Sequence, residues 1–495
     1  MISRFALSAL AAVAACACSA PSAAEQPPTY GWKASDIAPL QHPDWSRDAI
    51  LYQLNTRQFT REGTFRAAET QLPRLKKLGV DIIWLMPIHP IGEKNRKGSL
   101  GSPYSVKDYY TVNPELGSLE DFKHFVKAAH AQNMKVIIDW VANHSAWDNR
   151  LATEHPDWYE KDWKGDFRPT PWWDWSDIID FDWSKEGVRA HVGEAMLYWV
   201  RETDIDGFRA DVAGYVPLDF WITVRARLDR IKPVFMLAEW KTPEMHKAFD
   251  ATYAWEWHNS VRDIAKGKAD ATALYGYYAE NESAWPASAM RMGYIENHDS
   301  NAWDGSQYEV FGDALPAMMA LSFTHEGLSM IYNGQEACNA KRLAFFDHDP
   351  IDWNARPDCK LGSLLSDLAA FRKANPALAN APWGGRMTKL DNDMPAQLLS
   401  WVRQTGSNKV VGLFNLSPRP LRAKLTSKLG QGDYRTFRTG ERRTIGEREE
   451  IYLPPWGFAL YAAQGASSHQ RKPEGQTRPS NKAADVERTS TATRG

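Results

Sequence analysis

At 495 residues the chain is longer than one ordinary compact core, although α/β barrels extend that limit. The formal net charge is −2 and no long run of one sign occurs, which argues against a nucleic-acid partner and a basic membrane-surface helix. Many of the 22 Trp, 18 Tyr and 19 Phe residues must fill the core, but such a surplus also fits a protein that stacks flat apolar faces of sugars.

The N-terminus has the pattern of a secretory signal. Arg4 precedes a short apolar run that ends in small residues and is too short to span a membrane as a mature helix. Small-residue cleavage after residues 1–24 would release a soluble protein, whereas the lipobox-like run VAAC would leave Cys16 lipidated. We therefore expect an exported protein, either secreted or held as a periplasmic or outer-membrane lipoprotein.

Residues 25–47, rich in Pro, Ala and polar groups, are predicted to be a linker. After them, Thr64 is the expected N-cap of one helix that runs to Leu78, and Ser118 opens another helix with a capping box. Apolar segments predict eight strands, at residues 49–54, 80–88, 135–141, 205–212, 234–240, 251–255, 291–299 and 328–336. Such strand–helix alternation predicts an α/β fold, a closed (β/α)8 TIM barrel over residues 48–375.

Two further regions interrupt or follow this pattern. About forty residues with seven tryptophans separate the third strand from an amphipathic helix at 185–203, and they predict a short inserted subdomain at about 144–184 that acts as a lid or binding loop. Short strands at regular spacing predict a C-terminal antiparallel β-sandwich domain at 376–463. Residues 464–495 contain no aromatic, Leu, Ile or Met residue and are expected to be a disordered tail.

The two cysteines outside the signal are Cys338 and Cys359. In an oxidising compartment they could form a disulfide that closes a loop, or they could be two separate buried thiols. Neither alternative bears on chemistry.

Carboxylates lie near the carboxyl ends of three predicted strands. Arg209 and Asp211 are two residues apart on one face of the fourth strand, a spacing that alone indicates no more than an ion pair. Glu239 ends the fifth strand and Asp299 the seventh. Because the carboxyl ends of barrel strands line the reaction site, the three together indicate a catalytic centre.

Six segments, each at a predicted strand end, carry a resemblance to a known family. Residues 139–144 (DWVANH), 207–211 (GFRAD), 238–240 (AEW) and 296–299 (ENHD) resemble, in this order, four signature segments of the α-amylase superfamily, glycoside hydrolase family 13. Residues 80–87 and 331–336 look like two more family segments, and the resemblance covers residues 48 to about 460.

The chemistry of such enzymes explains the carboxylates. Retaining glycoside hydrolysis needs a nucleophilic carboxylate and a carboxylic acid about 5–5.5 Å apart, and neighbouring strands are about 4.8 Å apart. Asp211 is therefore the expected nucleophile and Glu239 the general acid/base, as the resemblance also implies. Apolar neighbours of Glu239 could raise its pKa, and Arg209 would keep Asp211 ionised. The resemblance makes Asp299 the third carboxylate, which binds sugar hydroxyls and favours the distorted transition state.

The same resemblance implies four more substrate-binding or supporting residues. His144 and His298 match hydrogen-bonding histidines at the cleaved sugar, Tyr104 matches an aromatic platform, and Asp139 matches a supporting carboxylate. Taken singly, Tyr104 and the tryptophans would be packing residues, and His144 a core histidine bonded to a carbonyl. No paired histidine spacing favours metal ligation by these histidines.

The chain also departs from the family pattern. Gly214 and Tyr215 stand where many α-amylases have Lys-His, a pair that helps to bind the leaving-group side. The family's calcium site matches Asn143 and, in the insert, Asp180, and oxygen ligands of that kind suit calcium. The insert is short and the Lys-His pair is absent, so the resemblance leaves structural calcium open and implies no cofactor for the chemistry itself.

We expect an enzyme that hydrolyses α-1,4 bonds of starch-like α-glucans or maltooligosaccharides with retention. One alternative is a transglycosylase or a cyclomaltodextrinase- or neopullulanase-type enzyme, since the same three carboxylates serve both reactions. The other is a non-catalytic carbohydrate-binding or transport-associated barrel, a class whose members typically lose these carboxylates. The sequence implies no particular protein partner.

Overall fold

The computed structural model describes residues 37–463, and an eight-stranded parallel sheet lies at its centre. The predicted signal with Cys16, most of the predicted linker and the predicted tail at 464–495 lie outside the described residues. The sheet order is β10-β1-β2-β3-β6-β7-β8-β9, and a parallel bridge between Gly293 and Ser329 joins its two edges. The predicted (β/α)8 barrel is thus confirmed. Its strands are β1 (Ile50–Leu54), β2 (Ile82–Leu85), β3 (Lys135–Trp140), β6 (Gly207–Ala210), β7 (Phe235–Ala238), β8 (Ala251–Tyr253), β9 (Met290–Met292) and β10 (Ser329–Tyr332).

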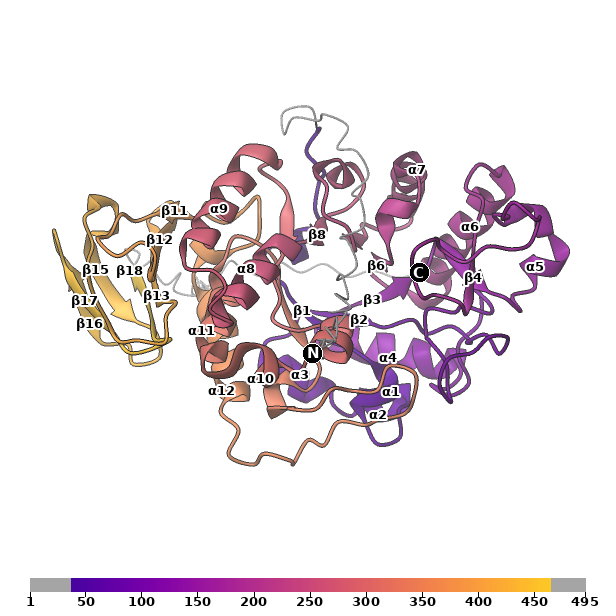
Figure 1. Cartoon of the computed structure of the whole chain (residues 1–495), viewed down its shortest axis with the longest axis horizontal. Helices are drawn as coiled ribbons and strands as arrows, with labels where there is room; N and C mark the ends of the chain where they lie inside the picture. Colours follow the sequence, from indigo (N-terminus) through magenta and orange to yellow (C-terminus); the bar gives the residue numbers. More distant parts are fainter. Residues whose placement is uncertain (1–36, 464–495) are drawn as a thin grey trace, which may run out of the picture.

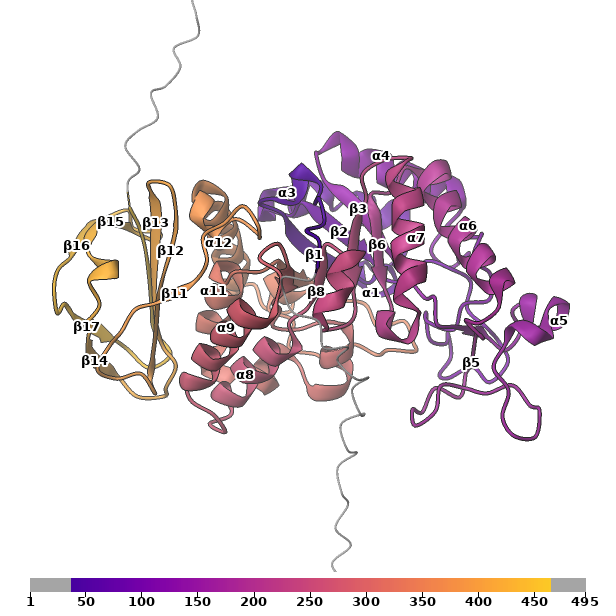
Figure 2. The ribbon, with the colours of Figure 1, turned by 90° about the horizontal axis from the view of Figure 1, so that it is seen from above.

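Helices surround these strands, and the insert and the C-terminal region lie on opposite sides of the molecule (Figures 1 and 2). The helices of the barrel are α1 (Thr56–Phe59), α2 (Phe65–Glu69), α3 (Leu72–Leu78), α4 (Leu119–Ala131), α6 (Glu186–Thr203), α7 (Leu218–Asp229), α8 (Trp255–Ala265), α9 (Thr272–Ala284), α10 (Gln307–Phe311), α11 (Leu315–Thr324) and α12 (Leu361–Ala374). Among the described residues, no helix is both long and apolar enough to cross a bilayer.

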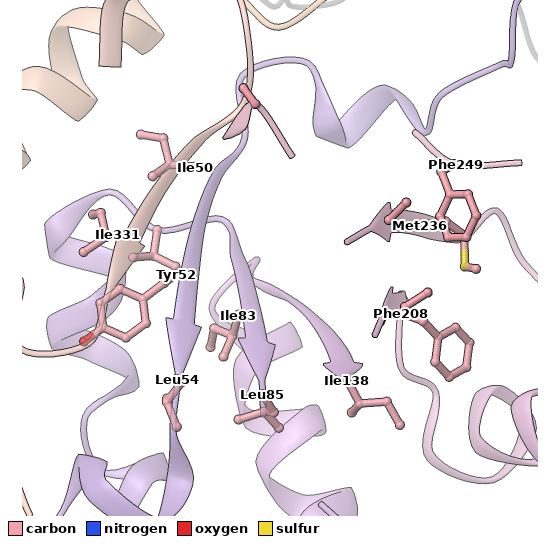
Figure 3. Packing of buried hydrophobic residues seen from close by; sticks show 14 of the residues in the cluster. Ile50, Tyr52, Leu54, Ile83, Leu85, Ile138, Phe208, Met236, Phe249 and Ile331 are labelled. Carbon is pink, nitrogen blue, oxygen red and sulfur yellow. The ribbon is translucent and has the colours of Figure 1, made fainter. Parts of the chain in front are cut away.

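The strands are buried on both faces, which explains their nearly continuous apolar sequence. Inward-facing residues such as Leu51, Trp84 and Leu237 fill the barrel. Outward-facing residues such as Tyr52 and Phe208 pack under the helices, and Figure 3 shows part of this layer. The successive residues Leu51 and Tyr52 thus belong to different cores, as the two-residue period of a strand requires.

The predicted helix at residues 64–78 and the predicted strand ends differ from the observed ones. The single helix predicted from Thr64 to Leu78 is two helices, α2 and α3; Thr64 does cap the first through its side chain. Pro73 lies in the first turn of α3, where its missing N–H and its ring prevent continuation from α2. The seventh and eighth strands are shorter than predicted, so residues 296–299 lie in the loop after β9 rather than within a strand.

The insert and the C-terminal region are small β structures. In the insert, β4 (His144–Ala146) pairs with β5 (Ile178–Asp180), and α5 (Leu151–Glu154) lies between them. The C-terminal region has a six-stranded antiparallel sheet and a two-stranded one that share a core, as a sandwich requires. Its strands are β11 (Thr388–Lys389), β12 (Leu398–Thr405), β13 (Asn408–Asn415), β14 (Leu421–Lys424), β15 (Gly432–Thr436), β16 (Arg442–Ile445), β17 (Glu450–Leu453) and β18 (Phe458–Ala463).

The end of the predicted linker packs on the barrel. His42 is buried, and its ring contacts Asp250 Oδ1 and the Ser288 carbonyl, both at 2.8 Å. Ser46 is also buried, and its hydroxyl donates to the Pro43 carbonyl at 2.7 Å. Residues from His42 onward therefore belong to the folded body rather than to a linker.

Candidate active site

The carboxyl ends of the barrel strands surround a cavity of about 530 Å³. Six of the residues singled out in the sequence line it: Tyr104, His144, Asp211, Glu239, His298 and Asp299. A larger hollow of about 890 Å³ lies between the loop after β2 and the insert, but none of those six residues lines it. We therefore take the smaller cavity as the candidate site.

Arg209 connects the carboxylates at the floor of this cavity. Its Nη1 donates to Asp139 Oδ1 at 2.7 Å and to Asp211 Oδ1 at 2.9 Å, and its Nη2 lies 2.9 Å from Glu239 Oε1. The Arg209 side chain is fully buried, with the ring of Trp84 5.1 Å from its guanidinium carbon. One guanidinium thus holds three carboxyl groups in place.

The backbone explains why two of these carboxyl groups meet. Strands β6 and β7 pair with Ala210 opposite Ala238, and the Glu239 N–H donates to the Ala210 carbonyl at 3.0 Å. Asp211 and Glu239 are the next residues on the two strands, about one strand spacing apart. That spacing suits a retaining pair of carboxylates.

The four carboxyl groups in and below the cavity have raised pKa values. Burial raises the pKa of Asp139 and of Asp299 to about 6. Burial and the neighbouring Glu239 raise the pKa of Asp211, and the Arg209 guanidinium opposes both effects. Burial also raises the pKa of Glu239. Because one guanidinium faces four carboxyl groups, protons are retained in the group, as a general acid requires.

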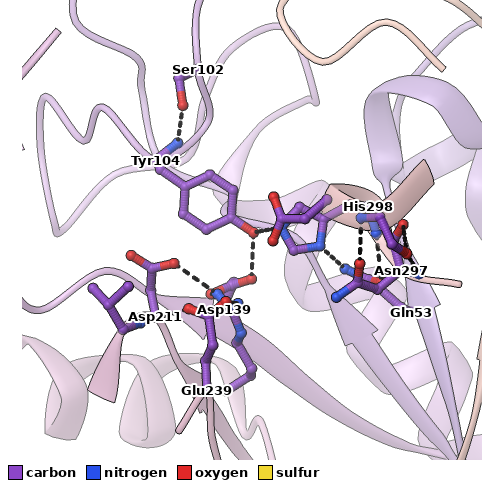
Figure 4. A network of polar contacts seen from close by, with 12 residues as sticks. Gln53, Ser102, Tyr104, Asp139, Asp211, Glu239, Asn297 and His298 are labelled. Atoms are coloured by element: carbon purple, nitrogen blue, oxygen red, sulfur yellow. Dashed lines mark hydrogen bonds and ion pairs between the residues drawn. The ribbon is translucent and has the colours of Figure 1, made fainter. Parts of the chain in front are cut away.

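A hydrogen-bonded chain fixes the ring of His298 (Figure 4). The Gln53 amide donates to His298 Nδ1 at 2.6 Å, and His298 Nε2 contacts the Tyr104 hydroxyl at 2.7 Å. That hydroxyl donates to Asp139 Oδ2 at 3.0 Å, and Trp84 Nε1 donates to the same oxygen at 3.1 Å. Burial lowers the pKa of His298 to about 3, so the imidazole is neutral at physiological pH.

His144 lies at the start of β4, where the insert leaves the barrel. Its Nε2 has no hydrogen-bond partner among the described residues, although His144 is buried and lines the cavity. Burial lowers the pKa of His144 to about 4, so the neutral ring can donate to or accept from a sugar hydroxyl. Asp299 completes the set, with Oδ2 3.3 Å from His298 Nε2.

The two residues matched to the family's calcium site lie behind His144 but satisfy one another. Asn143 Nδ2 donates to Asp180 Oδ1 at 3.0 Å, and the Thr170 hydroxyl donates to the same oxygen at 2.5 Å. Calcium needs six to eight oxygen ligands, whereas the side chains of Asn143, Asp180 and Thr170 hold four oxygens in all and are bonded to one another. Within residues 37–463 no cluster of three or more acidic, His or Cys side chains suits a metal. This arrangement does not fit calcium.

Several residues of the cavity carried no signal in the sequence. Gln53, one residue before the end of β1, does not line the cavity but bonds to His298, and its position near a strand end could have identified it. The others lie on loops whose partners are distant in sequence, and only the fold brings them together. These loop residues are Lys97, Ser102, Trp303, Phe345 and Phe346. Trp173, Asp174, Trp175 and Asp177, which also line the cavity, belong to the insert that the sequence predicts as a lid or binding loop.

Tyr215, Trp240 and Trp173 form an aromatic wall next to Glu239, and Gly214 leaves room for the Trp240 ring. A Cβ on Gly214 would lie 1.9 Å from the Trp240 ring, so only glycine fits there. Tyr215 packs edge-on against Trp240, with ring centroids 5.5 Å apart. Trp173 Nε1 donates to the Tyr215 hydroxyl at 3.0 Å and its ring stacks on Trp175. The insert therefore contributes directly to this side of the cavity.

Known proteins are similar to this chain in sequence and in fold. The family model of the α-amylase catalytic domain matches residues 46–360. α-Amylase MalA of Haloarcula japonica is 31% identical over 80% of this chain and 60% of its own length. An α-1,4-glucan:maltose-1-phosphate maltosyltransferase of Myxococcus xanthus is 27% identical over 67% of this chain and 54% of its own length. The chain thus spans little more than half the length of these curated relatives.

Two solved structures show how far the architecture is shared. The maltogenic α-amylase AmyB of Thermotoga neapolitana superposes with a TM-score of 0.77 at 31% identity, over 84% of this chain and 98% of its own. An α-amylase of Lactobacillus plantarum superposes with a TM-score of 0.74 at 28% identity, over 85% of this chain and 99% of its own.

Proposed function

Because the chain belongs to the α-amylase family, whose enzymes act on glycosidic bonds, we propose that it hydrolyses α-1,4-glucosidic bonds with retention. The substrates are starch-like α-glucans or maltooligosaccharides. The observation that carries this proposal is the placement of Asp211 and Glu239 at paired strand ends, both against the guanidinium of Arg209.

The proposed reaction has two steps. Asp211 attacks the anomeric carbon while Glu239 gives its proton to the departing glycosidic oxygen, which leaves a covalent glycosyl-enzyme. Glu239 then takes a proton from water, whose oxygen attacks the same carbon and releases Asp211. Asp211 reacts as its carboxylate: burial and the neighbouring Glu239 raise its pKa, and the hydrogen-bonded guanidinium of Arg209 lowers it.

The remaining residues bind the sugar. Tyr104 and His298 lie with their rings nearly parallel, 5.5 Å between centroids, and provide a face for the glycone. The unpartnered Nε2 of His144 is available for a hydroxyl. Asp299 borders the same cavity and, as a carboxylate, would hold hydroxyls of the distorted sugar.

The test uses two variants with a matched control. Asp211→Asn and Glu239→Gln should each reduce kcat on maltoheptaose by at least about 10²–10⁴-fold, with circular dichroism unchanged. The control is Asp219→Asn: Asp219 lies on α7, is exposed and pairs with Arg189 of α6, so this variant should retain the parent rate. α-Maltosyl fluoride separates the two roles, because fluoride leaves without a proton. A rapid first release of one fluoride per enzyme should survive in Glu239→Gln, followed by slow turnover because water then lacks its base, whereas Asp211→Asn should show no such release. Parent-like rates in either variant would refute the assignment.

Transglycosylation is a second candidate, favoured by the aromatic wall beside Glu239. Trp173 and Tyr215 could seat an acceptor sugar, whose hydroxyl would then replace water in the second step. A product assay at rising maltose concentration decides between them: a transglycosylase accumulates longer oligosaccharides, and a hydrolase does not.

Export remains part of the proposal. It rests on the apolar N-terminal run, with either a released protein or one lipidated at Cys16. The disulfide between Cys338 and Cys359 supports it, since such bonds persist in oxidising compartments.

A further inference from the structure

The loop between β10 and α12 is firmly attached to the barrel and carries two aromatic residues into the cavity. The disulfide between Cys338 and Cys359 joins the two ends of this loop. The middle of the loop is held by α1, where Gln58 Nε2 donates to the carbonyls of Ala344 and Asp347, both at 2.7 Å. The loop therefore holds Phe345 and Phe346 against the cavity as fixed walls.

A second loop, which follows β2, is joined to the first. The Leu100 N–H donates to the Phe346 carbonyl at 3.1 Å. Ser99 donates to Asp347 Oδ1 twice, from its N–H at 2.8 Å and from its hydroxyl at 2.5 Å. Gly98 has a φ of +62°, and a Cβ there would lie 2.5 Å from Phe346 Cβ, so the two loops touch at their backbones.

The insert completes the connection. Lys97 Nζ donates to the Asp174 carbonyl and lies 3.7 Å from Asp177 Oδ1. Lys97, Asp174 and Asp177 all line the cavity. Lys97 thus attaches the two joined loops to the insert. The bridge is defined here as these two loops, residues 97–100 and residues 345–347.

Glu239 identifies which end of the cavity the bridge occupies. In the proposed function Glu239 protonates the leaving group, which must lie on its side, next to Val212 and Tyr215. Trp173 of the insert lies on that side as well, since its Nε1 donates to the Tyr215 hydroxyl. Phe345 instead continues the stack of Tyr104 and His298, with centroids at 6.1 and 6.0 Å, and so extends the face that the proposed function gives to the glycone.

We propose that the bridge closes the glycone end of the cavity, so that the enzyme binds the non-reducing ends of α-glucans and releases short oligosaccharides from them. The inference rests on the proposed function and adds the mode of attack. An endo-acting enzyme needs a groove open at both ends, whereas here a chain that continued past the glycone would meet Phe345, Phe346 and Lys97. The length of the released unit is set by the room between the bridge and Asp211.

Two p-nitrophenyl α-maltoheptaosides test this inference, one free at its non-reducing glucose and one blocked there by a 4,6-O-ethylidene group. Chromatography of all nitrophenyl products should show the free substrate cleaved and the blocked one cleaved roughly 100-fold more slowly, since a closed site has no room for the added group. Equal cleavage of both overturns the inference and leaves the proposed function standing. Cleavage of neither overturns the proposed function itself.

The double variant Ser99→Ala/Asp347→Ala assigns the closure to the bridge. It removes both Ser99 hydroxyl and Asp347 carboxylate, and the ratio of blocked to free cleavage should rise at least about tenfold in the same preparation. The control is Asp433→Ala, which removes a matching contact, a 2.6 Å bond from the Thr444 hydroxyl in the C-terminal region. An unchanged ratio in the double variant would contradict the role of the bridge.

Discussion

Glu296 shows how one buried carboxyl group near the site can be structural rather than catalytic. Its Oε1 accepts hydrogen bonds from Asn301 Nδ2 at 2.7 Å and from the Gln307 N–H at 2.9 Å, which join the loop after β9 to α10. Burial raises the pKa of Glu296 to about 8, so it is largely protonated at neutral pH.

This raised pKa predicts a pH-dependent effect of Glu296→Gln. Between the ordinary value of 4.5 and about 8 the folded state holds a proton that the unfolded state has lost, so the stability of the parent falls as pH rises through that window. Gln keeps the accepting oxygen and does not titrate. The variant should match the parent near pH 4 and exceed it increasingly toward pH 8, as measured by urea unfolding across this range.

Glu309→Gln is the control for the opposite sign. The side chain of Arg342 and the capping contacts of Ser306 lower the pKa of Glu309 to about 2. The ionised Glu309 therefore stabilises the folded state at pH values above its ordinary pKa of 4.5, and this stabilisation is lost as pH falls toward 2. Removing the carboxylate cannot stabilise the protein at pH 8. A similar gain in both variants would contradict the account of Glu296.

At the residue scale, the sequence identified residues that belong to a recognisable motif, both at strand ends and on loops such as that of Asp299, and missed loop residues outside any motif. Asp211, Glu239 and Asp299 follow apolar runs, and such positions must meet at one rim of a parallel barrel. Phe345 and Lys97 reach the same cavity only through contacts between loops more than 240 residues apart, such as Ser99 with Asp347. No local pattern encodes such a meeting.

At the element scale, Gly207 permits β6 and β7 to pair closely at their amino ends, which sets the register that brings Asp211 and Glu239 together at the other end. It has a φ of +151°, and a Cβ there would lie 1.8 Å from the Phe235 carbonyl oxygen. Gly207→Ala should therefore destabilise the protein by about 1–3 kcal/mol or more and separate Asp211 from Glu239. Urea unfolding and kcat should both fall.

Gly276→Ala is the matched control for this prediction. Gly276 lies within α9, and nothing lies within 4 Å of the position that its Cβ would occupy. Alanine is favoured over glycine in a helix by about 1 kcal/mol, so this variant should gain stability. A loss at Gly276 together with no loss at Gly207 would contradict the packing described here.

Element types could be predicted from the sequence more reliably than element ends. The apolar runs and caps gave the barrel, the insert and the C-terminal strands their order, because burial on both faces leaves a strong signal. The residues at which helices and strands end depend on strand pairing and on single residues such as proline. Pro73 divides one predicted helix into α2 and α3, and β9 ends at Met292 although apolar residues continue beyond it.

At the scale of the whole molecule, buried arginines join the barrel to the C-terminal region. Arg403 of β12 donates to the carbonyls of Thr324 and His325 at the end of α11, at 3.2 and 2.6 Å. It also donates to Ala379 and Gly385 of the connecting segment, at 2.8 and 2.7 Å. The apolar core is continuous across the same junction. The two regions should therefore unfold together.

Arg403→Met tests this cooperativity. It leaves four buried carbonyl groups without their charged donor, and the expected loss exceeds about 3 kcal/mol. Calorimetry should show a single transition at a lower temperature. Lys409→Met, at a less buried donor on neighbouring β13, should shift that transition only slightly. Two separate transitions, with only one displaced by Arg403→Met, would show that the regions unfold independently.

The most direct test of the central claim is proton NMR of the anomeric signals in the first minutes of maltoheptaose cleavage. Attack by Asp211 followed by attack of water on the same carbon inverts the configuration twice, so the new reducing end should appear as the α-anomer before mutarotation. If the β-anomer appears first, no glycosyl-enzyme forms on Asp211, and the proposed roles of Asp211 and Glu239 are wrong.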